Sequence, residues 1–62
     1  MKAKYIKTMD FDFSNIDILN CNNPKELAEK IKENDVIKIY NSGVIEYINA
    51  SYIMYYELEE GE

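Results

Sequence analysis

The segment from Asp35 to Glu59 constrains the fold most, because strand-forming residues fill it on both sides of a single turn signal, Asn41-Ser42-Gly43. Five of the six tyrosines of the chain lie in this segment, and tyrosine and β-branched residues favour strands. The pattern predicts an antiparallel hairpin and, after the small polar break Asn49-Ala50-Ser51, a further strand from Tyr52 to Glu59. It describes a sheet surface without a recognisable catalytic motif.

The register of this hairpin depends on the length of its loop. A three-residue loop, with Gly43 in the left-handed conformation, places Tyr40 opposite Val44. A two-residue loop places Ile39 opposite Glu46 and mixes polar with apolar residues across the strand pair. We therefore predict the three-residue loop, whose apolar core side carries Ile37, Ile39, Ile45 and Tyr47. The other side then carries Val36, Tyr40, Val44 and Ile48 around an opposed Lys38 and Glu46.

The clearest helix signal begins at Asn23, which is a favourable N-cap residue. Pro24 suits the first helical position, and Glu26 stands where a capping box needs it. These signals predict a helix over about residues 24–33. Its apolar stripe, which we expect to face the core side of the hairpin, consists of Leu27, Ala28 and Ile31.

The residues before the helix predict two strands, a long one with a clear alternation and a second, shorter one. Residues 2–13 alternate between apolar and polar side chains, with Ile6 and Lys7 as exceptions, and Ser14-Asn15 then breaks the run. A short strand over residues 16–19 follows, although a tight hairpin at Ser14-Asn15 would oppose two aspartates, Asp12 and Asp17.

These elements predict a single small α+β domain over residues 1–62, with residues 60–62 as a frayed acidic tail. The predicted architecture is one antiparallel sheet of three to five strands with the helix packed on one face, in the order strand, short strand, helix and three strands. A domain of this size has a small core, and oligomerisation is a common source of added stability.

Residue types argue against an enzyme and against a metal or cofactor site. Cys21 is the only cysteine and the chain has no histidine, so Cys21 lacks the usual base, and the usual zinc ligand sets are missing. The aspartates around Ser14 fail the calcium-loop pattern, because Asn15 and Cys21 stand where glycine and glutamate are needed. A chain this small is also poorly suited to a pocket that would shift the pKa values of Glu46, Glu57 and Glu59.

Charge and hydropathy disfavour nucleic acid and membrane partners. The net charge is −5 and arginine is absent, whereas phosphate binding relies on basic residues. No apolar run approaches the roughly 20 residues that span a bilayer. The single cysteine and the absence of a signal-peptide pattern predict a cytoplasmic protein.

Our leading hypothesis is a non-enzymatic module that binds another protein through a tyrosine-bearing sheet surface and its acidic margin. Its small size favours a phage or mobile-element inhibitor of a host protein, and so does its high content of isoleucine, asparagine, lysine and tyrosine, a composition expected from an AT-rich genome. The candidate partner-binding residues are Tyr40, Val44, Ile48, Tyr52, Tyr55, Tyr56, Glu57, Glu59 and Glu60.

Other interpretations of the tyrosines remain open at this stage. They fill strand positions in any sheet protein, which β-propensity alone explains. A homo-oligomer with a self-association sheet face or a ligand site between subunits is the second hypothesis. A small nucleic-acid-binding regulator that uses Lys2, Lys4, Lys7 and the tyrosines is the third.

Overall fold

The computed structural model describes residues 1–59, and the predictions for the tail at residues 60–62, including Glu60, lie outside this range. Its elements are β1 (Lys2–Thr8), β2 (Asp12–Ile18), α1 (Pro24–Lys32), β3 (Val36–Asn41), β4 (Val44–Asn49), the 3-10 helix η1 (Ala50–Tyr52) and β5 (Ile53–Leu58). This order confirms the predicted α+β class.

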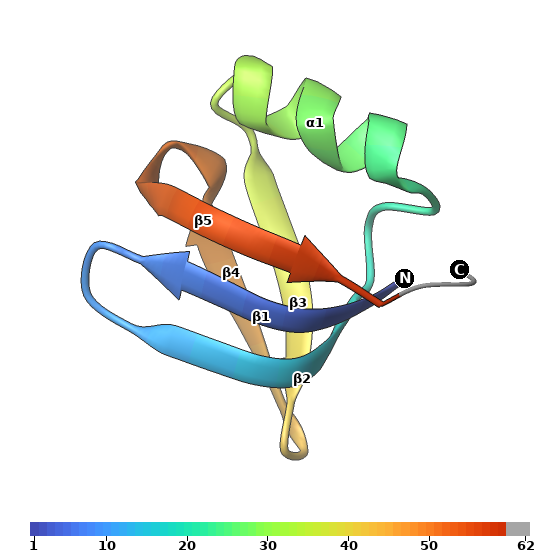
Figure 1. Ribbon diagram of the computed structural model, residues 1–62, viewed down its shortest axis with the longest axis vertical. Helices are drawn as coiled ribbons and strands as arrows, with labels where there is room; N and C mark the ends of the chain where they lie inside the picture. The colour runs from blue at the N-terminus through green and yellow to red at the C-terminus, as the bar shows by residue number, and fades with distance from the viewer. Residues whose placement is uncertain (60–62) are drawn as a thin grey trace.

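The five strands form one antiparallel sheet in the order β4-β3-β2-β1-β5. The first four strands meander, and β5 returns to pair with the far side of β1. Figure 1 shows that the sheet curls over on itself, so that β3 and β4 cross behind a layer of β1, β2 and β5, with α1 at one end. The core lies between these two parts of the sheet, closed at that end by the helix.

The helix follows its local signals. The Asn23 side chain accepts a hydrogen bond from the Glu26 N–H at 2.9 Å, and the Glu26 carboxylate accepts one from the Asn22 N–H at 2.8 Å. Leu27 is fully buried and Ile31 packs against the core, whereas Ala28 is exposed. The prediction for Ala28 was wrong, because the curled sheet receives the helix along a narrower stripe.

The first two strands differ from the prediction. β1 ends at Thr8, the chain reverses, and β2 then runs through the expected break at Ser14-Asn15. The cause is a change of phase in both strands: inward-facing residues are three apart at Ala3 and Ile6, and β1 carries a bulge between Ala3 and Tyr5. Asn15, with φ of 54°, makes the matching irregularity in β2. Uniform alternation was therefore the wrong assumption for residues 2–13.

The loop of the β3–β4 hairpin has two residues, so the predicted register was wrong. Asn41 lies opposite Val44, and Ser42 and Gly43 have φ of 51° and 86°. Two positive φ values define a type I′ turn, whose twist matches that of paired strands. The pairing of Ile39 with Glu46, which argued against this register, is present in the structure. Glu46 is only half-buried, and its carboxylate accepts a hydrogen bond from the Asn41 side-chain amide at 3.5 Å.

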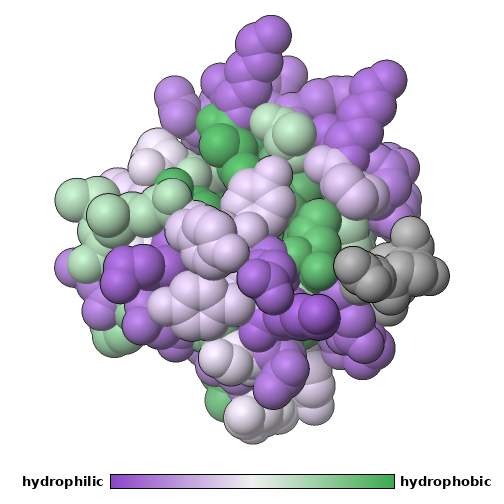
Figure 2. Space-filling model, viewed as in Figure 1, coloured by the Kyte–Doolittle hydropathy of each residue, from purple (hydrophilic) through white to green (hydrophobic). Residues whose placement is uncertain are grey.

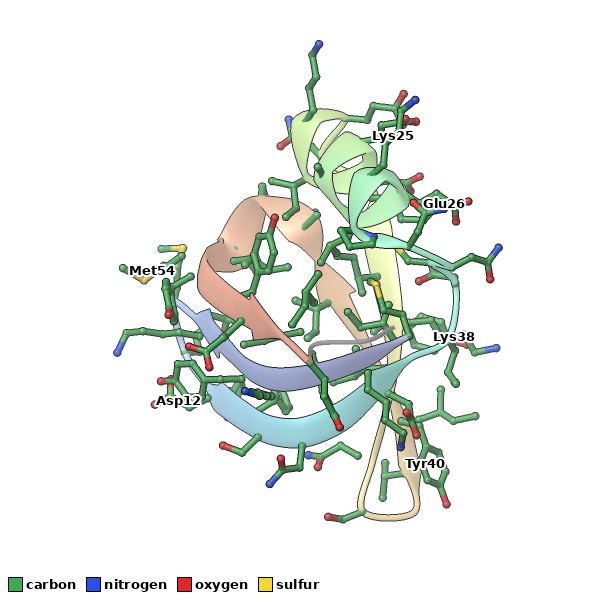
Figure 3. All side chains as sticks on the ribbon, turned by 45° about the vertical axis from the view of Figure 1, so that its right-hand side comes forward. Asp12, Lys25, Glu26, Lys38, Tyr40 and Met54 are labelled. Atoms are coloured by element: carbon green, nitrogen blue, oxygen red, sulfur yellow. The ribbon has the colours of Figure 1, made fainter. Side chains whose placement is uncertain are left out.

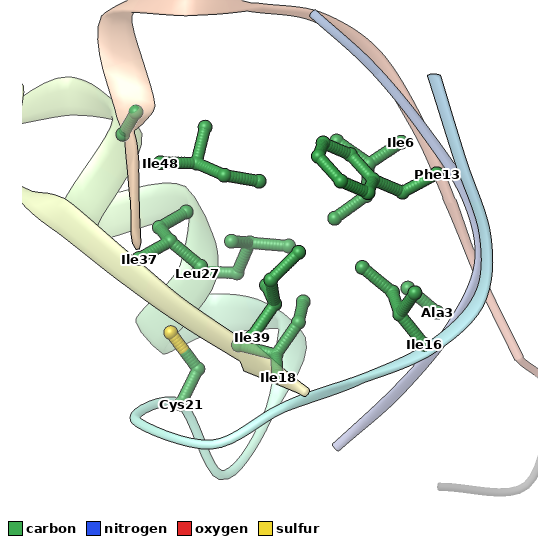
Figure 4. Close-up of a cluster of buried hydrophobic side chains, with 11 residues drawn as sticks. Ala3, Ile6, Phe13, Ile16, Ile18, Cys21, Leu27, Ile37, Ile39 and Ile48 are labelled. Atoms are coloured by element: carbon green, nitrogen blue, oxygen red, sulfur yellow. The ribbon is translucent and has the colours of Figure 1, made fainter. Parts of the chain in front are cut away.

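The corrected register reverses part of the predicted core. Ile37 and Ile39 are buried as expected, and Ile48 lies opposite Ile37 and is buried with it. Ile45 and Tyr47, which the prediction placed inside, are exposed. Figure 4 shows the resulting core between the two parts of the sheet, built from Ala3, Ile6, Phe13, Ile16, Ile18, Cys21, Leu27, Ile37, Ile39, Ile48 and Ala50.

The type I′ turn can be tested at its two central residues. An added Cβ at Gly43 meets nothing within 4 Å, so Gly43→Ala should cost only backbone strain and lower the free energy of unfolding by about 1–2 kcal/mol. Ser42→Asn should instead raise it by about 0.5 kcal/mol, because Asn-Gly is the preferred pair in this turn. Urea unfolding followed by circular dichroism measures both changes. Equal effects of the same sign would contradict the turn type.

Candidate functional site

The outer side of β3 and β4 carries the main candidate surface, a group of apolar side chains that face solvent. Figure 3 shows Lys38 and Tyr40 pointing away from the core on this side. We call this surface the hairpin face, and its apolar members are Leu19, Val36, Tyr40, Ile45 and Tyr47. Each of the five is between 42% and 68% exposed.

Strand pairing makes the hairpin face continuous. Tyr40 lies opposite Ile45, and Lys38 lies opposite Tyr47, so these side chains share one side of the sheet. Leu19 joins them from the end of β2, because its N–H donates to the Lys38 carbonyl at 2.7 Å. Together they form one continuous group of exposed apolar side chains on this side of the sheet.

Little charge interrupts this surface. Lys38 is half-buried between the apolar side chains. Asp17, which lies opposite Tyr40 on the neighbouring strand, forms an ion pair with Lys2 at 3.3 Å. The hairpin face is therefore a mainly apolar patch with a polar margin, the anatomy typical of a protein interface.

A second aromatic surface lies on the outer side of β1 and β5 and is more polar. The rings of Tyr5 and Tyr55 stand 6.0 Å apart, and the Tyr55 hydroxyl donates to Glu57 at 3.1 Å, a bond that raises the pKa of Tyr55. Partial desolvation and the nearby Asp12 carboxylate raise the pKa of Tyr5. Figure 2 shows this side, where weakly hydrophilic side chains gather among strongly hydrophilic ones.

The structure does not bring the predicted partner-binding residues together on one surface. Tyr40 lies on the hairpin face, whereas Tyr55 and Glu57 lie on β5, three strands away in the sheet. Ile48 is only 7% exposed and belongs to the core, and Tyr56 is half-buried against it. The remaining described members are all exposed, at the hairpin tip, on η1 and after β5: Val44, Tyr52 and Glu59.

Sequence reasoning missed four members of the hairpin face: Leu19, Val36, Ile45 and Tyr47. Ile45 and Tyr47 were assigned to the core, and Leu19 was placed in a short strand without a binding role. Val36 was grouped with Ile48 on the wrong register. The signal that could have found them is the Ser42-Gly43 pair, since a glycine in the second position of a two-residue loop is typical of type I′ hairpins.

A groove of about 240 Å³ lies between β4 and the turn that joins β1 to β2. The Thr8 hydroxyl shapes this turn, because it donates to the Phe11 carbonyl at 2.7 Å and accepts from the Phe11 N–H at 2.9 Å. It also accepts from the Asp10 N–H at 3.3 Å. The residues that line the groove are Thr8, Asp10, Phe11, Phe13, Glu46, Tyr47, Ile48, Asn49 and Tyr52.

Replacing the buried hydroxyl of Thr8 tests the origin of this groove. Thr8→Val keeps the shape of the side chain but leaves the Phe11 N–H without its acceptor, and we expect it to lower the free energy of unfolding by about 1–3 kcal/mol. Hydrogen exchange at the Phe11 amide should also accelerate. Thr8→Ser is the control, because it retains the hydroxyl and should keep that amide protected. Equal exchange rates in the two variants would show that the hydroxyl does not hold the turn.

Other side chains of the described range do not converge on a reactive site. Burial raises the pKa of the Cys21 thiol, which disfavours the nucleophilic thiolate. Residues 1–59 contain no group of three or more cysteine, aspartate or glutamate side chains placed to hold a metal ion. Two of the three lysines of β1 stand beside acids, because Lys2 pairs with Asp17 and Lys7 lies opposite Asp12.

Within residues 1–59, no helix is long and apolar enough to cross a membrane.

Comparisons with protein-family models, with curated proteins and with solved structures found no match. Function is therefore inferred from surface geometry and chemistry.

Proposed function

We propose that this chain is a non-enzymatic module that binds another protein through the hairpin face. The observation that carries this proposal is the exposure of five large apolar side chains on one side of the sheet, around Lys38 and beside Asp17. Two of the five are tyrosines, which combine apolar area with a hydroxyl group and are enriched among residues that dominate binding energy.

The partner that fits best has an apolar patch within a basic surface. The chain carries a net charge of −5 and would be attracted to a basic protein. Attraction between opposite net charges increases the association rate more than the affinity. A module of this size acts most directly by covering a functional surface of its partner. Inhibition of a host protein is the specific form of this activity that we propose, on the basis of the size and amino-acid composition of the chain.

Affinity capture from the source organism, followed by mass spectrometry, tests the proposal. The wild-type chain should enrich a specific protein, and a variant with Ile45→Lys and Tyr47→Lys should lose it. The matched control carries Met54→Lys and Tyr55→Lys, which add the same charge at equally exposed positions of β5, and it should still capture the partner. Capture that is lost in the control and kept in the hairpin-face variant would refute the assignment of this surface.

A homo-oligomer is the second candidate function, because the hairpin face is apolar enough to pack on a copy of itself. A symmetric dimer would bury the same five side chains from both subunits. Light scattering at increasing protein concentration separates the two functions. A strict monomer at tens of micromolar would exclude self-association as the role of this surface.

A further inference from the structure

β4 is the end strand of the sheet, and its outer edge presents backbone groups to solvent. The Ala50 N–H donates to the Asp35 carbonyl at 2.8 Å, and the Lys38 carbonyl accepts from the N–H of Leu19, the residue after β2. In an antiparallel pair, hydrogen-bonded and non-hydrogen-bonded positions alternate. Because the Lys38 carbonyl points to β2, Lys38 and Tyr47 form a non-hydrogen-bonded pair, and Tyr47 directs its own N–H and C=O away from β3. The backbone groups at the free edge are those of Ile45, Tyr47 and Asn49.

This edge carries one of the features that usually prevent another strand from pairing with it, the inward-facing charge of Glu46, and lacks the others. The register between β3 and β4 is unbroken along all six residues of β4, which include neither lysine nor proline. The opposite edge of the sheet is protected: β5 has a register shift between Tyr55 and Ile53, and Glu57 and Glu59 follow. The contrast between the two edges marks β4 as the one that accepts a partner strand.

The groove described above runs beside this edge. Residues 46–49 of β4 line one wall, and three aromatic side chains, Phe11, Phe13 and Tyr52, line the rest together with Thr8 and Asp10. Phe11 is 66% exposed. An extended segment that paired with the β4 backbone would therefore place alternate side chains against aromatic rings, as in known cases of strand addition.

The charges of the groove decide between a second copy and a different protein. Among the described residues that line it, Asp10 and Glu46 are the ionisable ones other than tyrosine, and both are acidic. Pairing of two β4 strands would bring four carboxylates to one interface, which is unfavourable. A segment that carries lysine or arginine would instead meet carboxylates of opposite charge.

We propose that the β4 edge and its aromatic groove bind an extended segment of a partner protein by strand addition, with apolar residues alternating with lysine or arginine. This inference rests on the proposed function and specifies the partner. The segment pairs with the backbone of Ile45, Tyr47 and Asn49. Its lysine or arginine side chains enter the groove beside Asp10 and Glu46, and its apolar side chains lie beside Ile45 and Tyr47 on the hairpin face.

A peptide titration followed by nuclear magnetic resonance tests strand addition. The probe is a nine-residue peptide of alternating valine and lysine, and its matched control replaces every lysine by glutamate. The lysine peptide should bind saturably, slow hydrogen exchange at the amides of Ile45, Tyr47 and Asn49, and bind at least about tenfold more tightly than the glutamate peptide. Equal binding of both peptides, or binding of neither at millimolar concentration, would overturn the proposal.

A pair of substitutions at Asn49 separates backbone pairing from side-chain contact. Asn49 has φ of −69°, which proline adopts without strain, and its N–H faces the free edge. Asn49→Pro should weaken binding of the lysine peptide about tenfold or more, while Asn49→Ala, which also loses the side-chain bond to Ser51 but keeps the N–H, should change it less than about threefold. Unchanged chemical shifts of core amides establish that both variants are folded.

The outcomes distinguish this inference from the proposed function. If the lysine peptide shifts resonances of Val36 and Tyr40 without protecting the edge amides, strand addition is wrong and binding by the hairpin face stands. If the edge amides become protected when the chain alone is concentrated, the occupant is a second copy and the partner segment is overturned. If capture of a protein requires Ile45 and Tyr47 but does not require the Asn49 N–H, the proposed function is supported and strand addition at the β4 edge is refuted.

Discussion

Replacing Ile48 by alanine is expected to lower the free energy of unfolding by about 2–5 kcal/mol, while the same replacement at Ile45 should cost less than about 1 kcal/mol. Ile48 is only 7% exposed and packs in the core opposite Ile37, so truncation leaves a cavity. Ile45 is 49% exposed on the outer side of the sheet, where truncation leaves none. The two residues have the same chemistry and lie in the same strand, which makes each the control for the other.

Urea unfolding monitored by circular dichroism measures both costs. A core of this size supports only about 3–5 kcal/mol of stability, so Ile48→Ala should leave a large unfolded fraction even without urea. Ile48→Val, which removes one methylene, keeps the experiment informative if the alanine variant does not fold, and it should cost about 0.5–1.5 kcal/mol. A larger cost at Ile45 than at Ile48 would restore the three-residue loop and the register that it implies.

The helix was the part of the fold best specified by local sequence. Its start at Pro24 depends on the Asn23 cap and on Glu26, and these interactions involve residues at most four apart. Such signals are independent of the rest of the chain. The α+β class and the single antiparallel sheet were also predictable, because strand-forming segments surround one short helix and their apolar sides need one core.

The strand registers were not predictable by the same means. Matching polarity across the hairpin assumed that each side of the sheet is uniformly buried or exposed. The curled sheet breaks this assumption, since Glu46 sits half-buried at the open end of the core, opposite the fully buried Ile39. The loop residues were the more reliable guide, because two positive φ values in a row fix the register whatever the side chains oppose.

The phase change near Asn15 had a similar effect on the first two strands. A bulge moves the alternation by one residue, so a pattern that is regular in space becomes irregular in sequence. The break in the apolar–polar alternation at Ile6 and Lys7 was the sign of this change in the sequence. Their burial is opposite, with Ile6 inside and Lys7 outside, in agreement with the shifted phase.

The error in register also moved the candidate site. Composition correctly drew attention to the tyrosines, but their positions depend on which side of the sheet each strand residue occupies. With the two-residue loop, Tyr47 leaves the core and joins Tyr40 on the hairpin face, while Ile48 leaves the candidate surface. One residue of shift thus exchanged the inside and outside of a whole strand, as the two-residue period of strands requires.

The hairpin face and the β4 edge share Tyr47, whose side chain belongs to the first and whose backbone belongs to the second. A partner that adds a strand to β4 would therefore extend the hairpin face by one strand and cover Tyr47 from both sides. Residues at the centre of an interface, where water is excluded, contribute most of the binding energy. This position makes Tyr47 the residue whose loss should affect binding most.

Tyr47→Ala is accordingly expected to weaken binding of the captured partner by about 30-fold or more, which corresponds to at least about 2 kcal/mol. Isothermal titration calorimetry with the purified partner measures the change. Tyr55→Ala is the matched control, because Tyr55 is also an exposed tyrosine in an outer strand but lies on β5, and its loss should change the affinity less than about threefold. Both side chains are at least half exposed, so neither truncation should alter the fold. The reverse order of effects would move the interface to the second aromatic surface, on the outer side of β1 and β5, where Tyr55 donates to Glu57.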